Sequence, residues 1–113
     1  MNAIASGLSA WLLQRVSAVY IALFLLYALI SLAMFQPADY QHWLAWVNHS
    51  YRHLFIALFF VALIFHAWVG GRDVILDYVH PYAWRLLSLI ALGGFLLWLL
   101  LWALRILYSV STL

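Results

Sequence analysis

Apolar residues fill three long stretches of this chain, and polar residues gather between them. These apolar stretches run over Val16–Phe35, Leu54–Gly71 and Leu86–Leu104. An α-helix rises about 1.5 Å per residue, so each stretch covers roughly 30 Å, the thickness of a hydrocarbon core. The pattern therefore predicts an all-α integral membrane protein. We expect one membrane-anchored domain over residues 1–113, with spans over about residues 11–35, 52–78 and 82–108.

The segments between the stretches carry helix-ending and surface signals. Pro37 ends the first helix, because proline lacks the N–H that a continuing helix needs. Within residues 38–53, Trp43, Trp46 and Val47 follow i, i+3, i+4 spacing, which predicts a short amphipathic helix lying on the membrane surface. Residues 1–10 are expected to form an interfacial or disordered start. Pro81 is expected to be the first residue of the third helix, where its missing N–H is spare.

Composition supports a membrane location and excludes several classes of site. Hydrophobic residues make up 70% of the chain and charged residues 7%, whereas a soluble domain is about 25% charged. Cysteine is absent, which excludes disulfides, thiolate metal sites and cysteine nucleophiles. The five basic residues are scattered and the net charge is only +2, so no nucleic-acid surface is expected. The lipid bilayer is the expected surrounding.

The arginines give a weak bias in orientation. Three spans place the two termini on opposite sides of the membrane, and the side of the N-terminus receives one more arginine than the other. Arginines preferentially lie on the cytoplasmic side. We therefore expect a cytoplasmic N-terminus and a periplasmic C-terminus. The arginines on the first side are Arg15, Arg72 and Arg85, and those on the second are Arg52 and Arg105.

His66 is the only ionisable residue inside the second apolar stretch. Such a residue at membrane depth is a candidate functional site, because lipid offers it no hydrogen bond. We interpret His66 as an axial ligand of a haem iron. At about 100° per residue, one stripe of the helix carries His66 with small residues one turn away, Ala62 and Gly70, which would clear space for a flat macrocycle. A histidine that only hydrogen-bonds a neighbouring helix explains the same spacing, and small residues then serve close helix packing.

A second axial ligand is missing from this sequence. His53 and His80 lie roughly 20 Å from His66 at 1.5 Å per residue. A six-coordinate haem would therefore need a histidine from a second polypeptide, and three helices alone enclose too little space for a haem. A haem-free membrane scaffold is the main alternative function. A channel or transporter subunit is disfavoured, because the first and third stretches contain almost no polar residues.

Further polar residues near the ends of the stretches each allow two interpretations. Arg15 either extends its charge to the lipid headgroups or pairs with an anion such as a haem propionate. Ser17 is expected to bond its own helix rather than a ligand. Asp77 and Tyr78 are either ordinary interfacial residues or parts of a binding site. Gly93 and its neighbour Gly94 either admit another helix or face lipid.

The chain resembles the family of small hydrophobic membrane anchors of bacterial succinate dehydrogenase, part of respiratory complex II. The resemblance rests on three motifs and extends, through length and span placement, over nearly the whole chain. These motifs are Gln14-Arg15-Val16-Ser17-Ala18, His66-Ala67-Trp68-Val69-Gly70 and Asp77-Tyr78-Val79-His80-Pro81. The second and third at this spacing are fairly specific. His80 departs from the family pattern, since some relatives carry lysine there.

The resemblance implies a function and a set of partners. It implies a haem b shared with a second membrane anchor, a cytochrome b subunit, with His66 as this chain's ligand and Arg15 near a propionate. It implies that Tyr78 hydrogen-bonds ubiquinone with Asp77 nearby, and that an iron–sulfur subunit and a flavoprotein subunit oxidise succinate. The chain alone is then no enzyme but an anchor of succinate:ubiquinone oxidoreductase in the bacterial inner membrane.

Overall fold

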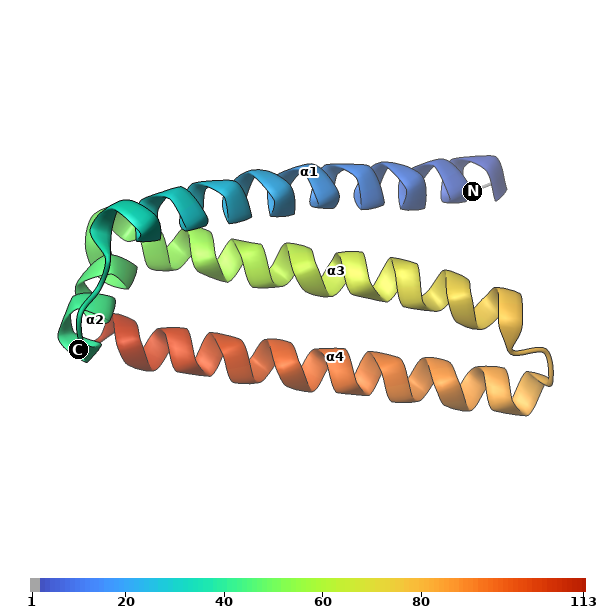
Figure 1. Ribbon diagram of the computed structural model, residues 1–113. Coiled ribbons are helices and arrows are strands. Elements are labelled where there is room, and N and C mark those ends of the chain that lie inside the picture. The colour runs from blue at the N-terminus through green and yellow to red at the C-terminus, as the bar shows by residue number, and fades with distance from the viewer. Residues whose placement is uncertain (1–2) are drawn as a thin grey trace.

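The computed structural model describes the backbone of residues 3–113 and the side chains of residues 7–113. Figure 1 shows three long helices side by side and a short helical connection at one end. Each long helix is long and apolar enough to cross a membrane, which confirms the predicted all-α membrane fold. The elements are α1 (Ala3–Phe35), α2 (Tyr40–Asn48), the single 3-10 turn η1 (His49–Tyr51), α3 (Arg52–Tyr78) and α4 (Tyr82–Ser111).

Helix α3 lies between the other two long helices. It packs against both α1 and α4, whereas α1 and α4 lie on opposite sides of it and bring no Cα atoms within 8 Å of each other in the described chain. The bundle is therefore open, and few of its described side chains are buried. Those below the surface are Ser17, Trp46, Val69 and Leu96. Many large apolar side chains are exposed, and they would face lipid or a partner.

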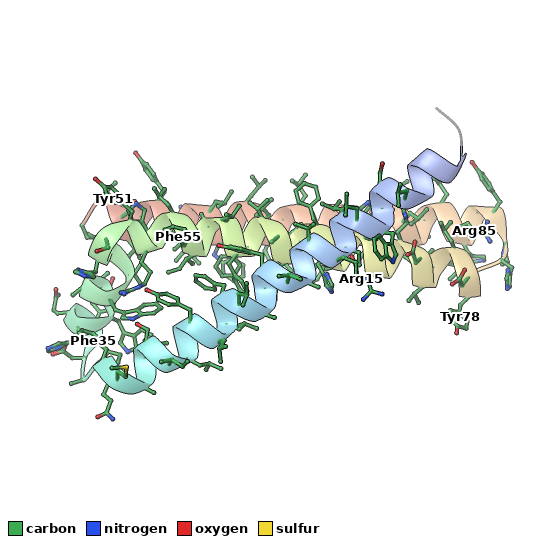
Figure 2. All side chains as sticks on the ribbon, turned by 90° about the horizontal axis from the view of Figure 1, so that it is seen from above. Arg15, Phe35, Tyr51, Phe55, Tyr78 and Arg85 are labelled. Carbon is green, nitrogen blue, oxygen red and sulfur yellow. The ribbon has the colours of Figure 1, made fainter. Side chains whose placement is uncertain are left out.

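The two ends of the bundle differ in what they carry. The N-terminal end of α1 lies beside the α3–α4 loop, and the C-terminus lies beside α2 at the opposite end. In Figure 2, Arg15, Tyr78 and Arg85 lie toward the first end, and Phe35 and Tyr51 mark the second. This arrangement agrees with the predicted three-span topology. Which end faces the cytoplasm stays a prediction.

The short helix α2 forms where the amphipathic pattern predicted one, but its apolar face packs on the protein itself. Trp46 is only 6% exposed, and its Nε1 donates to Ser31 Oγ of α1 at 2.8 Å. The Arg52 guanidinium lies 4.5 Å from the centre of the Trp46 ring. Trp46 thus packs against α1 at one end of the bundle. The expectation that α2 lies on the membrane surface stays a prediction.

Asp39 begins α2 as its N-cap. Its Oδ1 accepts hydrogen bonds from the backbone N–H of His42 at 2.9 Å and from the His42 ring at 2.7 Å. These two bonds hold the pKa of the Asp39 carboxyl below its usual value. A capping carboxylate satisfies a backbone donor that a helix start leaves without a partner.

The two expected starts of helices need correction. Residues 3–10 are helical and form the beginning of α1, so the disordered alternative is wrong for them and the interfacial one stays a prediction; residues 1–2 lie outside the described residues. Pro81 is the N-cap of α4 rather than its first residue, and its carbonyl accepts the backbone N–H of Arg85 at 2.9 Å. The Arg85 guanidinium also donates to the carbonyls of Val79 at 2.9 Å and Leu76 at 3.1 Å. Arg85 thus ties the last turn of α3 to the start of α4.

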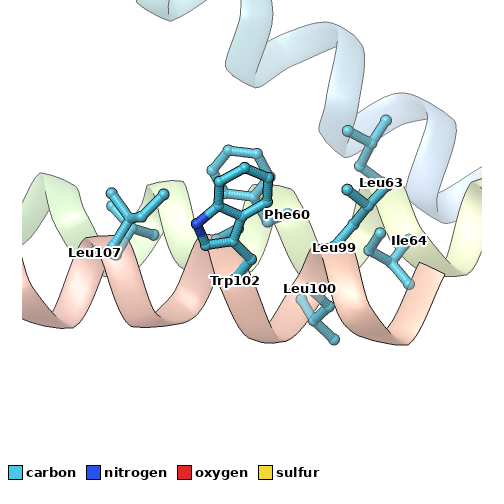
Figure 3. A pocket seen from close by; sticks show the side chains of 9 residues that line it. Phe60, Leu63, Ile64, Leu99, Leu100, Trp102 and Leu107 are labelled. Atoms are coloured by element: carbon cyan, nitrogen blue, oxygen red, sulfur yellow. The ribbon is translucent and has the colours of Figure 1, made fainter. Parts of the chain in front are cut away.

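The α3–α4 interface is apolar and closely packed near the loop. A Cβ on Gly71 would lie 2.6 Å from Leu92 Cδ2, and one on Gly93 would lie 3.4 Å from the Trp68 ring. Gly94, by contrast, has open space beside it. Farther along, the two helices leave a cavity of about 340 Å³ lined only by apolar residues (Figure 3). Among them are Phe60, Leu63 and Ile64 of α3 and Leu99, Leu100 and Trp102 of α4.

Candidate functional site

His66 lies on the side of α3 that faces α1. Its Nδ1 is 3.2 Å from the Oγ of Ser17. Ser17 is 5% exposed, and its hydroxyl also donates to the backbone carbonyl of Gln14 at 3.0 Å. The expectation that Ser17 bonds its own helix is therefore correct but incomplete, since the same oxygen reaches α3.

This contact uses only one of the two ring nitrogens. Among the described residues, none offers a hydrogen bond to His66 Nε2. An imidazole that bonds a neighbouring helix through Nδ1 still has Nε2 for a metal ion. The two interpretations of His66, helix packing and iron ligation, are thus compatible in this geometry.

A cavity of about 530 Å³ lies between α1 and α3 beside His66. It brings His66 together with Arg15, the other residue expected near a haem. The Arg15 guanidinium lies 5.5 Å from the centre of the Trp11 ring, and no described carboxylate pairs with it. Arg72, in contrast, pairs with its neighbour Asp73 at 3.3 Å. The cavity is lined mainly by Trp11, Gln14, Arg15, His66, Val69, Arg72 and Asp73.

Two buried polar atoms of residues that line this cavity lack a hydrogen-bond partner in the described chain, namely Gln14 Oε1 and Arg72 Nε. Buried polar atoms without partners are rare in folded proteins. Together with the Arg15 cation, which no described carboxylate pairs with, they make this a polar cavity in a largely apolar molecule. Its arginine N–H donors suit an anionic group, and His66 suits a metal.

Gly70 lies beside α1. A Cβ at this position would lie 3.7 Å from Gln14 Nε2 of α1, an ordinary van der Waals distance. This fits the alternative in which small residues allow close helix packing, and the expectation that Gly70 clears space for a macrocycle stays a prediction.

Asp77 and Tyr78 lie apart from this cavity, at the last turn of α3. Tyr78 is 78% exposed and projects away from the bundle in Figure 2. Neither side chain has a hydrogen-bond partner among the described residues. The structure thus divides the predicted site residues into one pair at the α1–α3 cavity, Arg15 and His66, and one exposed pair at the end of α3.

The described residues hold no group of three or more histidine, cysteine, aspartate or glutamate side chains able to bind a metal ion. His53 lies at the opposite end of α3 from the α3–α4 loop, and His80 lies in that loop. Neither lines the cavity beside His66. The structure therefore places no second histidine of the described chain beside His66.

Comparison with known proteins places the chain in a family. Residues 2–101 match the family model described as the succinate dehydrogenase/fumarate reductase transmembrane subunit. The chain belongs to this family. It is also 27% identical over 105 residues to the succinate dehydrogenase hydrophobic membrane anchor subunit of Coxiella burnetii (strain RSA 493 / Nine Mile phase I), an alignment that covers 88% of this chain and 91% of that protein. The resemblance to membrane anchors inferred from the sequence motifs is confirmed.

Some polar residues at the α1–α3 cavity were not predicted to lie at the site. Gln14 and Arg72 both line it, and Ser17 bonds the candidate ligand. Gln14 and Ser17 belong to the opening motif of the first span, so their sequence neighbourhood was noticed. Their contact with α3 was not, because it depends on how α1 is rotated and how far along α3 it lies.

Proposed function

We propose that this chain is a membrane-anchor subunit of succinate:ubiquinone oxidoreductase that supplies one axial ligand of a haem b and part of the quinone site. The observation that carries the proposal is the cavity that joins His66 to an arginine without a carboxylate partner. The family and the anchor subunit of Coxiella burnetii support the complex to which the chain is assigned.

The residues around this cavity fit a haem b. His66 would hold the iron through Nε2, while Nδ1 stays bonded to α1. Arg15 would pair with a propionate, an anion that its exposed guanidinium can reach at the membrane boundary. When bound, the haem supplies one-electron transfer through its iron.

The open bundle explains why a partner is required. Since α1 and α4 lie on opposite sides of α3 and few described residues are buried, the chain would not enclose a macrocycle by itself. A second membrane anchor, a cytochrome b subunit, would cover the open side and provide the opposite axial ligand. The iron–sulfur and flavoprotein subunits would attach at the membrane surface and oxidise succinate there.

Tyr78 would have a different role, in the quinone site. Its hydroxyl lies at the end of α3, exposed and without a partner in the described chain. There it would donate a hydrogen bond to a carbonyl oxygen of ubiquinone and hold the ring, with Asp77 nearby. Arg85 stabilises this end of α3 by binding the carbonyls of Leu76 and Val79. Ubiquinone would take two electrons and two protons to become ubiquinol.

The orientation follows from the arginine bias. The end of the bundle that carries the N-terminus and Tyr78 would face the cytoplasm in a bacterial inner membrane. Succinate oxidation and quinone reduction would then occur on the same side.

Purification of the tagged full chain from its native membrane in mild detergent tests the proposal. We expect a flavoprotein, an iron–sulfur protein and a second small membrane protein to co-purify. A b-type absorption band should appear in the reduced-minus-oxidised spectrum, and the complex should reduce ubiquinone with succinate. A complex with these subunits but no haem band would favour the haem-free scaffold, and the absence of the subunits would contradict the anchor function.

A further inference from the structure

We propose that Ser17 is a positioning residue that fixes the tautomer and the ring orientation of His66, so that Nε2 carries the lone pair for the metal. This inference rests on the proposed haem ligation. Ser17 belongs to α1 and would not touch the metal itself. The proposal explains why this polar side chain is buried.

The direction of the hydrogen bonds follows from counting protons. A serine hydroxyl carries one hydrogen, and a backbone carbonyl can only accept. Ser17 Oγ lies 3.0 Å from the carbonyl of Gln14 and donates its hydrogen there. The same oxygen, 3.2 Å from His66 Nδ1, must then accept, so Nδ1 carries the ring hydrogen.

A neutral imidazole has one protonated and one unprotonated nitrogen. With the hydrogen on Nδ1, the lone pair lies on Nε2, which has no hydrogen-bond partner among the described residues. If Ser17 instead donated to Nδ1, its bond to Gln14 would be lost and Nε2 would be protonated, unable to bind a metal. The bond within α1 therefore selects the tautomer of His66 on α3.

The burial of Ser17 protects its hydrogen bond with His66 from water. Ser17 is 5% exposed, so water cannot easily replace the serine as the partner of Nδ1. Metal-bound histidines usually donate their second N–H to such a group, which restrains the ring and raises its basicity. A hydroxyl is a neutral acceptor, so its effect should be moderate.

Replacement of Ser17 should not separate the two helices. A second hydrogen bond, from the Tyr20 hydroxyl to the Phe55 carbonyl at 2.8 Å, also joins α1 to α3. Ser17→Ala removes the acceptor and leaves that bond in place. Ser17→Thr keeps a hydroxyl that can still bond a carbonyl in the preceding turn.

The test is a redox titration of the haem in the purified complex, with each variant compared to the wild type. Loss of the acceptor lowers the basicity of His66 and so favours the ferrous state. Ser17→Ala should shift the ferric–ferrous equilibrium roughly three- to tenfold, where tenfold is about 59 mV for a one-electron couple. Ser17→Thr should restore a potential near that of the wild type.

Ser31→Ala is the matched control, because it removes the acceptor of another hydrogen bond from the same helix, the one to Trp46. Its potential should equal that of the wild type. If Ser17→Ala leaves both potential and spectrum unchanged while the wild type has its haem band, the positioning role is overturned and the haem proposal stands. A wild-type complex without a haem band would overturn both.

A second measurement uses the wild-type complex, so its result does not depend on whether Ser17→Ala assembles. In the ferrous, diamagnetic complex labelled with ¹⁵N-histidine, the Nδ1 signal of His66 should be that of a protonated nitrogen. An unprotonated Nδ1 would overturn the proposal even if Ser17→Ala fails to assemble.

Discussion

The two faces of α3 differ in chemistry although the helix is largely apolar. Toward α4 it presents phenylalanine, leucine and isoleucine side chains around an apolar cavity, and Gly71, which allows close packing. Toward α1 it presents His66 and Arg72, which line a polar cavity with Arg15. We infer that the first interface serves stability and that the second serves the cofactor.

The comparison also shows where polar groups can persist in a membrane protein. On the α1 side, the Ser17–His66 bond and the Arg72–Asp73 pair satisfy polar side chains within the chain. Gln14 Oε1 and Arg72 Nε beside this cavity have no hydrogen-bond partner among the described residues, and neither do Asn48 Oδ1 and His53 Nδ1 at the other end of the bundle. Nothing comparable lies beside the apolar α3–α4 cavity in the described residues.

The largest expected effect comes from His66→Ala in the purified complex. Removal of the imidazole should abolish or shift the b-type band. It should also weaken haem retention by about 10–100-fold or more, because loss of a group that only supports a metal ligand already costs that much in metal affinity. Ile64→Val, a change of one methyl group at the apolar face, should leave the spectrum unchanged. An unaltered spectrum in His66→Ala would contradict the division between the faces.

Tyr78→Phe tests the end of α3, which lies outside both interfaces. Loss of one hydrogen bond to the quinone should slow quinone reduction roughly tenfold, while succinate oxidation with an artificial acceptor stays near the wild-type rate. Tyr82→Phe is the matched control, since that tyrosine is 76% exposed across the same loop. Equal losses in both activities of Tyr78→Phe would instead indicate a structural role.

Gly71→Ile tests the apolar face. Because a Cβ there would already lie 2.6 Å from Leu92 Cδ2, the larger side chain should destabilise the α3–α4 pair by about 1–3 kcal/mol. Gly71→Ala should cost less, since the end of the Leu92 side chain can move. Thermal unfolding of the complex in detergent checks this, with the haem band before unfolding unchanged in both variants. Equal stability of the isoleucine and alanine variants would show that the interface is loose.

The smallest effect is expected at Asp39. Asp39→Ala removes the cap of α2 and should lower the unfolding temperature slightly, whereas Asp39→Asn should stay near the wild type. The pKa of Asp39 is lowered in the folded chain, so its contribution is present above the unfolded value and is lost as pH falls through the folded one. The difference between Asp39→Ala and wild type should therefore persist from pH 8 to pH 5. A difference that shrinks over this range would contradict the lowered pKa.

The sequence predicted the parts of the fold that depend on hydrophobic length. Three apolar runs between helix-ending signals were enough to identify α1, α3 and α4. The second span was expected over about residues 52–78, where α3 is found. The start of α1 was not predicted, because residues 3–10 lack both a strong apolar pattern and a helix breaker.

The candidate site was predicted less completely. His66 and Arg15 were identified because ionisable groups are costly in lipid, and the structure brings them to one cavity. The contact of Gln14 with Gly70 was missed, because the rotation of α1 about its axis is not encoded by hydropathy. All faces of a membrane helix are apolar, so periodicity does not show which face meets which neighbour.

A structure of the complete complex, detailed enough to place its cofactors, tests the central claim most directly. We predict that His66 Nε2 is bonded to a haem iron while Nδ1 remains hydrogen-bonded to Ser17, with a histidine of the second anchor on the opposite side of the iron. A His66 ring bonded to Ser17 alone, with no haem beside it, would contradict the account.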